Sequence, residues 1–357
     1  MIIAAIMTVA LLGGGDVALR ADKVWVDGAT AIDKGIVLVR DGRVADVGAN
    51  VEVPQDVQLI ECQGHLTAGL VALRAQIGLD GEGVDAARAI LPEAKIADAV
   101  RRDDPEFARL RAQGITAVVL APTATKLVPG STAVAKTTGA MVSDRAHLTV
   151  VFGGSALAFN REPTSYARQT EMLAELFDNG PKGAVSDAKN GRLPILWEVQ
   201  SKPEVRRALE FASARKLGGA LCGAPLAGEL AEEIAAAKLA VIVPASGAGE
   251  PMREAQSVAL LAKKGVTFGF GLDAPSNPAQ NLRMVAALSL RHGVEHGKAL
   301  NALTKDAAAI AGMGARAGSV ARGMDADLVL WSGDPLELSS AAKAVWVEGA
   351  LVHGGAQ

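Results

Sequence analysis

The sequence is poor in the residues that nucleic-acid binding and disulfide frameworks depend on. Aromatic residues make up 3% of its 357 residues, the net charge is −3, and no basic patch stands out. Binding through phosphate neutralisation and base stacking needs both features, so we expect no nucleic-acid partner. The two cysteines, Cys62 and Cys222, are too few for a disulfide framework and form no Cys-x-x-Cys pair.

Long hydrophobic runs are also scarce. The first, Ile2–Leu12, has the length of a signal peptide and is too short to span a bilayer comfortably. It lacks a preceding positive residue and a clean Ala-x-Ala site. We interpret residues 1–15 as a secretory signal with a misplaced start codon, and an apolar strand or retained anchor is the alternative. This predicts a periplasmic or exported protein, with a cytoplasmic one as the alternative. No second run of spanning length occurs, so the body is expected to be soluble.

Apolar sequence is plentiful: half of the residues are hydrophobic. A chain of this length can bury one barrel-sized domain with a smaller appendage, or two domains. Both ends alternate short β-rich runs with turns, and Asp41-Gly42 between IVLVR and RVADVG is a strong hairpin signal. Asp327–Trp331 and Ala344–Glu348 are expected strands. We predict that residues 16–66 and 316–357 join in one composite β-sandwich, because the two ends share three of the four tryptophans: Trp25, Trp331 and Trp346.

Between the ends, strands alternate with helices. Asp104-Pro105 is a helix-start signal, and Gly114 ends that helix before a strand at Ile115–Leu120. The remaining expected strands and helices are Leu193–Val199, a helix from Ser201, Ala220–Gly223, Leu226–Ala237, Leu239–Val243, Glu254–Lys264, Val266–Leu272, Asn277–His292 and Lys298–Gly312. The pattern is less regular between Gly78 and Arg192. Repeated β/α units without a dinucleotide fingerprint predict an α/β fold in which residues 67–315 form a TIM-like (β/α) barrel.

Several segments resemble, in the correct order, motifs of the amidohydrolase superfamily. The stretch Gln63–Leu79 is similar to the motif Gly-x-x-x-x-Pro-Gly-Leu-Ile-Asp-x-His-x-His, with Ala68 for the proline and Ala72 for the aspartate. Other similar segments are the hairpin Asp41–Gly48, the strand end Gly269–Pro275, the helix Ala299–Met313 and the return to the sandwich Gly318–Leu336. The resemblance implies the same barrel and composite sandwich, and the imidazolonepropionase-like subgroup is the most similar.

The resemblance also implies a chemistry. The superfamily hydrolyses amide, ring-amide and related carbon–nitrogen bonds with one or two metal ions, commonly zinc, that activate a water. An aspartate after the last strand moves the proton. By position, Arg74 and Gln76 replace the first pair of histidine ligands. Glu198 and Cys222 replace the later pair, and Asp273 keeps the place of the catalytic aspartate. The mid-barrel lysine would fall near the alanine at position 156.

These replacements predict a changed site. A guanidinium stays protonated and has no lone pair, so Arg74 cannot bind a cation. We hypothesise that Arg74 replaces the charge of the ion by pairing with Asp273 or Glu198 across the barrel mouth. The alternative is a zinc site of Glu198, Cys222 and Asp273, since carboxylate and thiolate both bind zinc. Against it, a lone cysteine in an apolar strand is typically a small buried hydrophobe, and Asp273 could be only a helix cap.

Two further patterns have plain interpretations. Pro129–Thr137 has the spacing of a phosphate-binding loop, but Ala135 stands where a glycine is needed and the Thr/Val alternation indicates a strand. By the resemblance this loop lies beside the barrel mouth, where Lys136 would help to bind an acidic ligand. His292–His296 fits the His-x-x-Glu-His pattern of inverted zinc proteases, but Gly293 interrupts the helix, so we expect a connection. The isolated His147 is expected at the surface or in the core.

Two functions follow. In the first, the protein is a pseudoenzyme without a cofactor that binds a small molecule or acts as a partner subunit, as a homo-oligomer or beside an intact paralogue. In the second, it is an active hydrolase with a reduced site, in which Asp273 shuttles the proton with one zinc ion or none.

Overall fold

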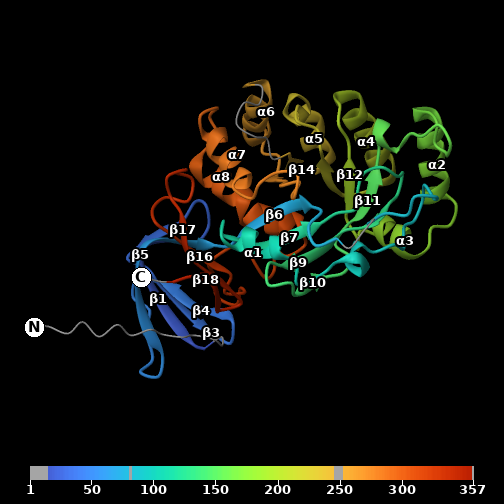
Figure 1. The fold of residues 1–357 in the computed structure, drawn as a ribbon. Coiled ribbons are helices and arrows are strands. Elements are labelled where there is room, and N and C mark those ends of the chain that lie inside the picture. The colour runs from blue at the N-terminus through green and yellow to red at the C-terminus, as the bar shows by residue number, and fades with distance from the viewer. Residues whose placement is uncertain (1–14, 80–82, 245–251, 356–357) are drawn as a thin grey trace, which may run out of the picture.

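The computed structural model describes residues 15–79, 83–244 and 252–355. The predicted signal-like segment, residues 1–15, lies outside these residues except for Gly15. Within the described ranges, no helix combines the length and the apolar character that a membrane span requires. Figure 1 shows a strand-rich part that contains the first and last strands of the chain, and a larger part in which helices surround strands.

Strands from both ends of the chain pair in one eight-stranded sheet of order β18-β17-β16-β5-β1-β3-β4, with β2 paired to β1. Their bounds are β1 Val17–Trp25, β2 Ala31–Asp33, β3 Ile36–Arg40, β4 Arg43–Gly48, β5 Gln58–Ala68, β16 Leu328–Trp331, β17 Ala342–Val347 and β18 Ala350–Gly354. β5 pairs with β1 in parallel and with β16 antiparallel, so the two ends of the chain meet along β5.

The sheet curls around one apolar core. Val44 of β4 and Trp346 of β17 lie near opposite ends of the strand order, yet both belong to this core. The turn between β3 and β4 meets the turn between β17 and β18 at Ala326. The Ala326 N–H donates to the Gly42 carbonyl, and the Gly349 N–H donates to the Ala326 carbonyl. The predicted sandwich built from both termini is confirmed, whereas its boundaries at 16–66 and 316–357 stay predictions.

The predicted hairpin at Asp41-Gly42 is also confirmed. β3 and β4 pair antiparallel up to Arg40 and Arg43 on either side of the turn. The φ angles of Asp41 and Gly42 are 49° and 73°. Both lie in the left-handed region that a type I′ turn requires, which asparagine, aspartate and glycine tolerate best.

The barrel begins where β5 passes through Gly69 into β6. Its parallel strands are β6 Leu70–Ala75, β7 Ile115–Leu120, β11 Leu148–Val151, β12 Ile195–Glu198, β13 Gly219–Cys222, β14 Ala240–Val243 and β15 Phe268–Phe270. β6 pairs with β7, and β11 to β15 pair in order. A parallel bridge between Leu73 and Gly271 brings the end of this series back to β6, so the strands close into a barrel.

The barrel wall is made of strand positions, here called staves. One of these staves runs antiparallel, which the sequence pattern did not predict. It consists of β8 (Gly130–Ser131) and β9 (Ala133–Lys136), separated by Thr132. β9 pairs antiparallel with β7, and β8 pairs antiparallel with β11. β10 (Met141–Ser143) adds a further antiparallel partner to β9. The strand expected in Pro129–Thr137 is therefore present, and it completes the ring between β7 and β11.

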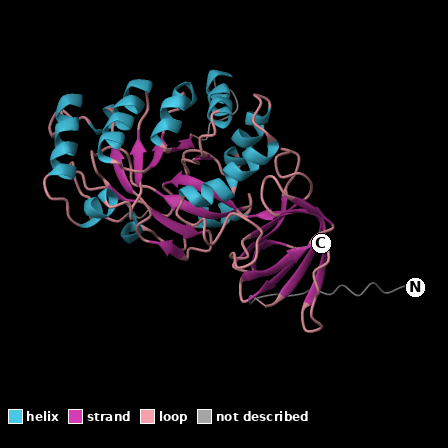
Figure 2. Cartoon of the chain, turned by 180° about the vertical axis from the view of Figure 1, so that it is seen from behind, coloured by secondary structure: helices cyan, strands magenta, loops and turns pink. Residues whose placement is uncertain are grey.

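Helices line the outer side of the barrel, as Figure 2 shows in cyan. Their bounds are α1 Pro105–Arg111, α2 Tyr166–Asp178, α3 Gly183–Lys189, α4 Lys202–Arg215, α5 Ala231–Ala237, α6 Met252–Lys263, α7 Asn281–Leu290, α8 His296–Leu303 and α9 Lys305–Ile310. Short 3-10 turns are η1 Ile96–Ala99, η2 Gly154–Ala156 and η3 Ala227–Leu230. The predicted start of α7 at Asn277 is wrong, because a residue that precedes a proline, here Pro278, disfavours the helical conformation.

Side chains alternate between the two faces of the barrel strands. On β12, Ile195 and Trp197 pack against the helices, whereas Leu196 faces the interior. Glu198 has the same parity as Leu196 and therefore points inward at the end of its strand. On β13, Ala220 and Cys222 belong to the interior cluster. The alternation thus sends one acid and one thiol into the same end of the barrel.

Candidate functional site at the barrel mouth

Four of the predicted site residues meet where the parallel strands end. Glu198 and Cys222 are the last residues of the neighbouring strands β12 and β13, and they are direct partners in the strand register. Arg74 lies near the end of β6, and Asp273 follows β15 after Gly271 and Leu272. Because β6 and β15 close the barrel, the sequence places an arginine, two acids and a thiol at one mouth.

A β-bulge positions Arg74. Between Ala72 and Ala75, β6 advances three residues while its partner β7 advances two, from Val118 to Leu120. The extra residue puts Arg74 in the left-handed region with φ of 58°. Such a conformation costs a residue other than glycine about 1 kcal/mol or more, and it persists where surrounding contacts fix it. The bulge turns the Arg74 side chain across the mouth.

Asp273 shares this backbone feature and is bonded to Arg74 twice. Its φ is 54°, also left-handed. Its backbone N–H donates to the Arg74 carbonyl at 2.9 Å. Its carboxylate accepts a hydrogen bond from Nη1 of Arg74. The two residues that close the barrel are therefore joined through both main chain and side chains.

The guanidinium of Arg74 also reaches the far side of the mouth. Its Nε donates to Oε1 of Glu198 at 2.7 Å. The side chains of Arg74 and Asp273 are 21% and 24% exposed, whereas that of Glu198 is 5% exposed. One guanidinium thus bridges a buried acid and a partly exposed acid from different staves. The hypothesised pairing exists, and it involves both acids.

Burial and charge act in opposite directions on these groups. Burial lowers the pKa of Arg74, but the Glu198 carboxylate outweighs it, and the pKa lies above its usual value. Burial raises the pKa of Glu198, which Arg74 partly offsets. Burial, and then the charge of Glu198, raise the pKa of the Cys222 thiol well above 9.0. Arg74 is therefore a permanent cation, and Cys222 stays a neutral thiol.

A model of the amidohydrolase family matches residues 210–353, a range that contains Cys222, Asp273 and the return to the sandwich. Over this range the chain is similar to the amidohydrolase family. The predicted α/β fold, a TIM-like barrel with a composite sandwich, is confirmed. The imidazolonepropionase-like subgroup stays a prediction.

Individual relatives support the same fold. Amidohydrolase tasK of Hapsidospora irregularis is 36% identical over 90 residues, which make up 25% of this chain and only 9% of that protein. An amidohydrolase from Thermotoga maritima MSB8 has a TM-score of 0.84 at 24% identity, over 95% of this chain and 100% of that chain. Molinate hydrolase has a TM-score of 0.64 at 14% identity, over 95% of both chains. At identities this low, the likeness to these solved structures shows a shared fold and no more.

The resemblance to amidohydrolases implies a metal centre at this mouth, and the side chains present do not fit one. A cation there would face the guanidinium of Arg74, which already holds both acids. Cys222 would have to lose a proton that its surroundings retain. Among the described residues, no group of three or more His, Cys, Asp and Glu side chains is arranged to hold a metal ion. Gln76, which follows Arg74, is half-buried, and its N–H donates to the Ala274 carbonyl.

Lys136 does not lie at the mouth, contrary to the prediction. It is opposite Ala117 in the register of β9 and β7, and Ala117 lies near the start of β7. The start of β7 is at the opposite end of the barrel from Arg74. Lys136 is fully buried, and its ammonium donates to Asp325 at 2.9 Å and to Asp327 at 2.5 Å. Its partners leave no access for an acidic ligand.

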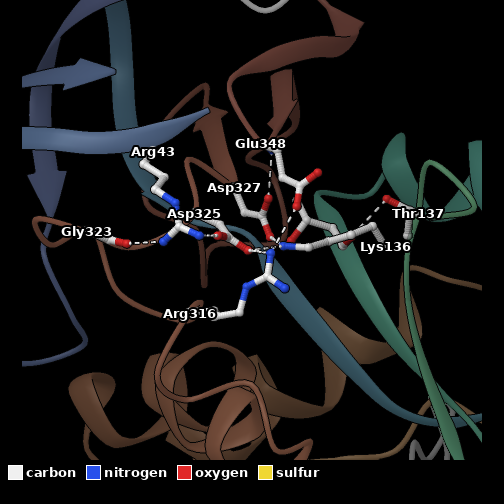
Figure 3. Close-up of polar contacts among 9 residues, drawn as sticks. Arg43, Lys136, Thr137, Arg316, Gly323, Asp325, Asp327 and Glu348 are labelled. Atoms are coloured by element: carbon white, nitrogen blue, oxygen red, sulfur yellow. Dashed lines mark hydrogen bonds and ion pairs between the residues drawn. The ribbon is translucent and has the colours of Figure 1, made fainter. Parts of the chain in front are cut away.

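Figure 3 shows that this lysine belongs to a charged joint between barrel and sandwich. Arg316 contacts Asp325 at 3.0 Å and Glu348 at 3.2 Å. Arg43 contacts Asp325 at 3.7 Å and donates to the Gly323 carbonyl. Sequence reasoning missed Asp325 and Asp327, although two acids separated by one residue lie on one face of an extended chain. Their partner Lys136 lies almost two hundred residues away, which no local pattern reveals.

His147 is a satisfied core histidine. It is 1% exposed. Its Nδ1 lies 2.8 Å from the Thr132 hydroxyl, and its Nε2 lies 2.7 Å from the Ile310 carbonyl. Because a carbonyl only accepts, Nε2 carries the proton and Nδ1 accepts from Thr132. Burial lowers the pKa of His147 to about 4, so the ring is neutral at pH 7.

Proposed function

We propose that this protein is a non-catalytic member of the amidohydrolase superfamily that binds a small molecule at the barrel mouth. The observation that carries the proposal is the Arg74 guanidinium bonded to both Glu198 and Asp273. A metal ion in such a site offers open coordination positions where a water becomes acidic. A guanidinium supplies positive charge but no coordination position, so hydrolysis through a metal-activated water is lost while a positive charge stays at the mouth.

The remaining polar atoms favour a particular kind of ligand. Arg74 uses Nε and Nη1, and Asp273 uses one carboxylate oxygen. Within the described residues, Nη2 of Arg74 and Oδ2 of Asp273 have no further hydrogen bond, and both side chains are partly exposed. A donor and an acceptor at one mouth match a group that accepts and donates in the same way, as an intact amide does. Such a ligand would be held without being cleaved.

A metal assay tests the proposal. Protein purified without chelator is dialysed against zinc and analysed by plasma mass spectrometry, together with Asp273→Ala and the control Asp33→Ala, an exposed acid of β2. We expect far less than one zinc per chain in all three proteins, because Arg74 occupies both acids. We also expect no hydrolysis of amide or cyclic-amide substrates.

The opposite result would favour the active hydrolase with a reduced site. Near one equivalent of zinc in the wild type, lost in Asp273→Ala and kept in Asp33→Ala, would overturn the proposal. So would metal-independent hydrolysis of an amide that disappears in Asp273→Ala, because Asp273 would then act as the proton shuttle. Neither function requires a partner subunit, and an oligomer with an intact paralogue remains a proposal that co-purification would test.

A further inference from the structure

A cavity lies at the end of the barrel opposite Arg74. It has a volume of about 480 Å³ and is bordered by residues that precede or begin β11 to β15 and by the ends of α5 and α9. Gly219 borders it and Cys222 belongs to the mouth, and these are the first and last residues of β13. At about 3.3 Å per residue, they are about 10 Å apart along the strand. The volume lies in the range of small-molecule pockets.

The cavity exists because small residues stand where barrels usually carry bulky ones. Barrel interiors are normally filled by valine, isoleucine and leucine. Here Ala220 of β13 and Ala240 of β14 face the cavity, with Ile310 at the end of α9 opposite them. Ala220 and Ile310 are buried, so the inner wall is apolar. An apolar ligand body would gain by covering this wall.

The polar side chains around the cavity favour an anion. Among the described residues that line the cavity, none is acidic, and Lys238 is the only one with a full charge. Lys238 is exposed and, in the described part of the chain, pairs with no carboxylate. Thr267 also lines the cavity and adds a hydroxyl. It lies beside the strand that follows Lys238, because its carbonyl accepts from the Val241 N–H of β14. An ammonium and a hydroxyl on neighbouring staves can both donate to one carboxylate.

The helix ends at this site do not reverse that preference. α5 and α9 both end at the cavity, and carbonyl groups at helix C-termini carry partial negative charge. His147 donates to the Ile310 carbonyl and so satisfies one of them. Lys238 follows the last residue of α5, where its positive charge offsets the carbonyls of that helix. The net field on a ligand headgroup is therefore set by Lys238.

We propose that this cavity is a second binding site for a small organic anion, a monocarboxylate with an apolar body. The carboxylate binds Lys238 and Thr267, and the body lies against Ala220, Ala240 and Ile310. This site is independent of the function proposed for the mouth, because it shares no residue with it.

Titration calorimetry of the full chain tests the proposal with three probes: hexanoate, benzoate and the neutral hexanamide. We expect both carboxylates to bind and hexanamide to bind about tenfold or more weakly, because a hydrogen bond to a charged group is worth more than a neutral one. In Lys238→Gln, carboxylate affinity should fall about tenfold. Lys216→Gln is the matched control, because Lys216 has the same left-handed conformation at the end of α4 and does not line the cavity.

The position of the site is tested by Ala240→Leu and Gln200→Ala. Ala240→Leu fills the cavity and should abolish binding of hexanoate, whereas Gln200→Ala changes an exposed side chain that follows β12 at the mouth end and should leave binding unchanged. Three results would overturn the proposal: no binding of either carboxylate at about 10 mM, equal affinity in Lys238→Gln, or loss of binding in Gln200→Ala. Because Lys238 is exposed, its variant should fold normally, and circular dichroism checks this.

Discussion

Arg74 donates through Nε to Glu198 and through Nη1 to Asp273, so one side chain pairs with two acids. The sequence allowed the chemistry to be stated beforehand, since a guanidinium cannot hold a cation in any fold. It did not reveal the bulge that turns Arg74 across the mouth, because the bulge appears only when β6 pairs with β7. The residue type therefore excluded cation binding by Arg74, and strand pairing decided where its side chain points.

At the residue scale, His147 predicts a pH dependence of stability. Burial lowers its pKa from 6.5 to about 4. The unfolded chain therefore takes up a proton at this residue between about pH 6.5 and pH 4 while the folded chain does not, so stability falls as the pH falls. We expect a loss of about 2 kcal/mol between pH 7 and pH 5 from this group alone. Urea unfolding at both pH values measures it in the wild type and in His147→Gln, which should lose less over this interval. An equal loss in the variant would contradict the assignment.

At the element scale, α4 shows how local and distant contacts combine. Its start after Ser201 was predictable, and the helix begins at Lys202 with Glu204 at the position of a capping box. Glu204 accepts from the N–H groups of Gln200 and Ser201 at 2.8 and 3.1 Å. It also accepts from the Gly154 N–H and the Tyr166 hydroxyl, which belong to another segment. Only the tertiary structure brings those last two donors to the cap.

This arrangement predicts that Glu204→Ala lowers the free energy of unfolding by about 2 kcal/mol, since it removes a cap and leaves part-buried donors without an acceptor. Glu210→Ala is the control, because Glu210 lies on the exposed face of the same helix. It should change stability by less than about 0.5 kcal/mol. Chemical denaturation of the two variants makes the comparison. Similar losses in both would show that Glu204 contributes no more than helix propensity.

The antiparallel strands β8 and β9 show, at the same scale, what the sequence pattern cannot predict. The alternation in Pro129–Thr137 predicted a strand, and β8 and β9 form there. Its direction could not be predicted, because alternation describes which side chains share a face and is identical in parallel and antiparallel strands. The missing helix between β7 and β9 was the available signal. It was obscured by the irregular pattern of the preceding residues.

For the whole molecule, Lys136 links barrel to sandwich through Asp325 and Asp327. All three side chains are almost fully buried. We predict that Lys136→Met lowers the free energy of unfolding by about 3–5 kcal/mol, because it leaves two buried acids without their ammonium. The control Lys95→Met breaks the exposed pair with Asp144 and should cost less than about 1 kcal/mol.

Thermal unfolding and urea titration compare these variants. Lys136→Met combined with Asp325→Asn and Asp327→Asn should recover part of the loss, because neutral amides are cheaper to bury than unpaired carboxylates. A Lys136→Met protein as stable as Lys95→Met would show that the joint contributes little to holding the two parts together.

The sequence by itself determined the two kinds of architecture, their order along the chain, and which side-chain types stand at the mouth. These depend on side-chain periodicity, turn residues and side-chain chemistry, which are local. The tertiary structure alone decided that Arg74 reaches both acids, that Lys136 lies in the joint, and that a cavity opens below Ala220 and Ala240. Each of these depends on contacts between residues far apart in the chain, whose distances are fixed only when the barrel closes and the sheet curls.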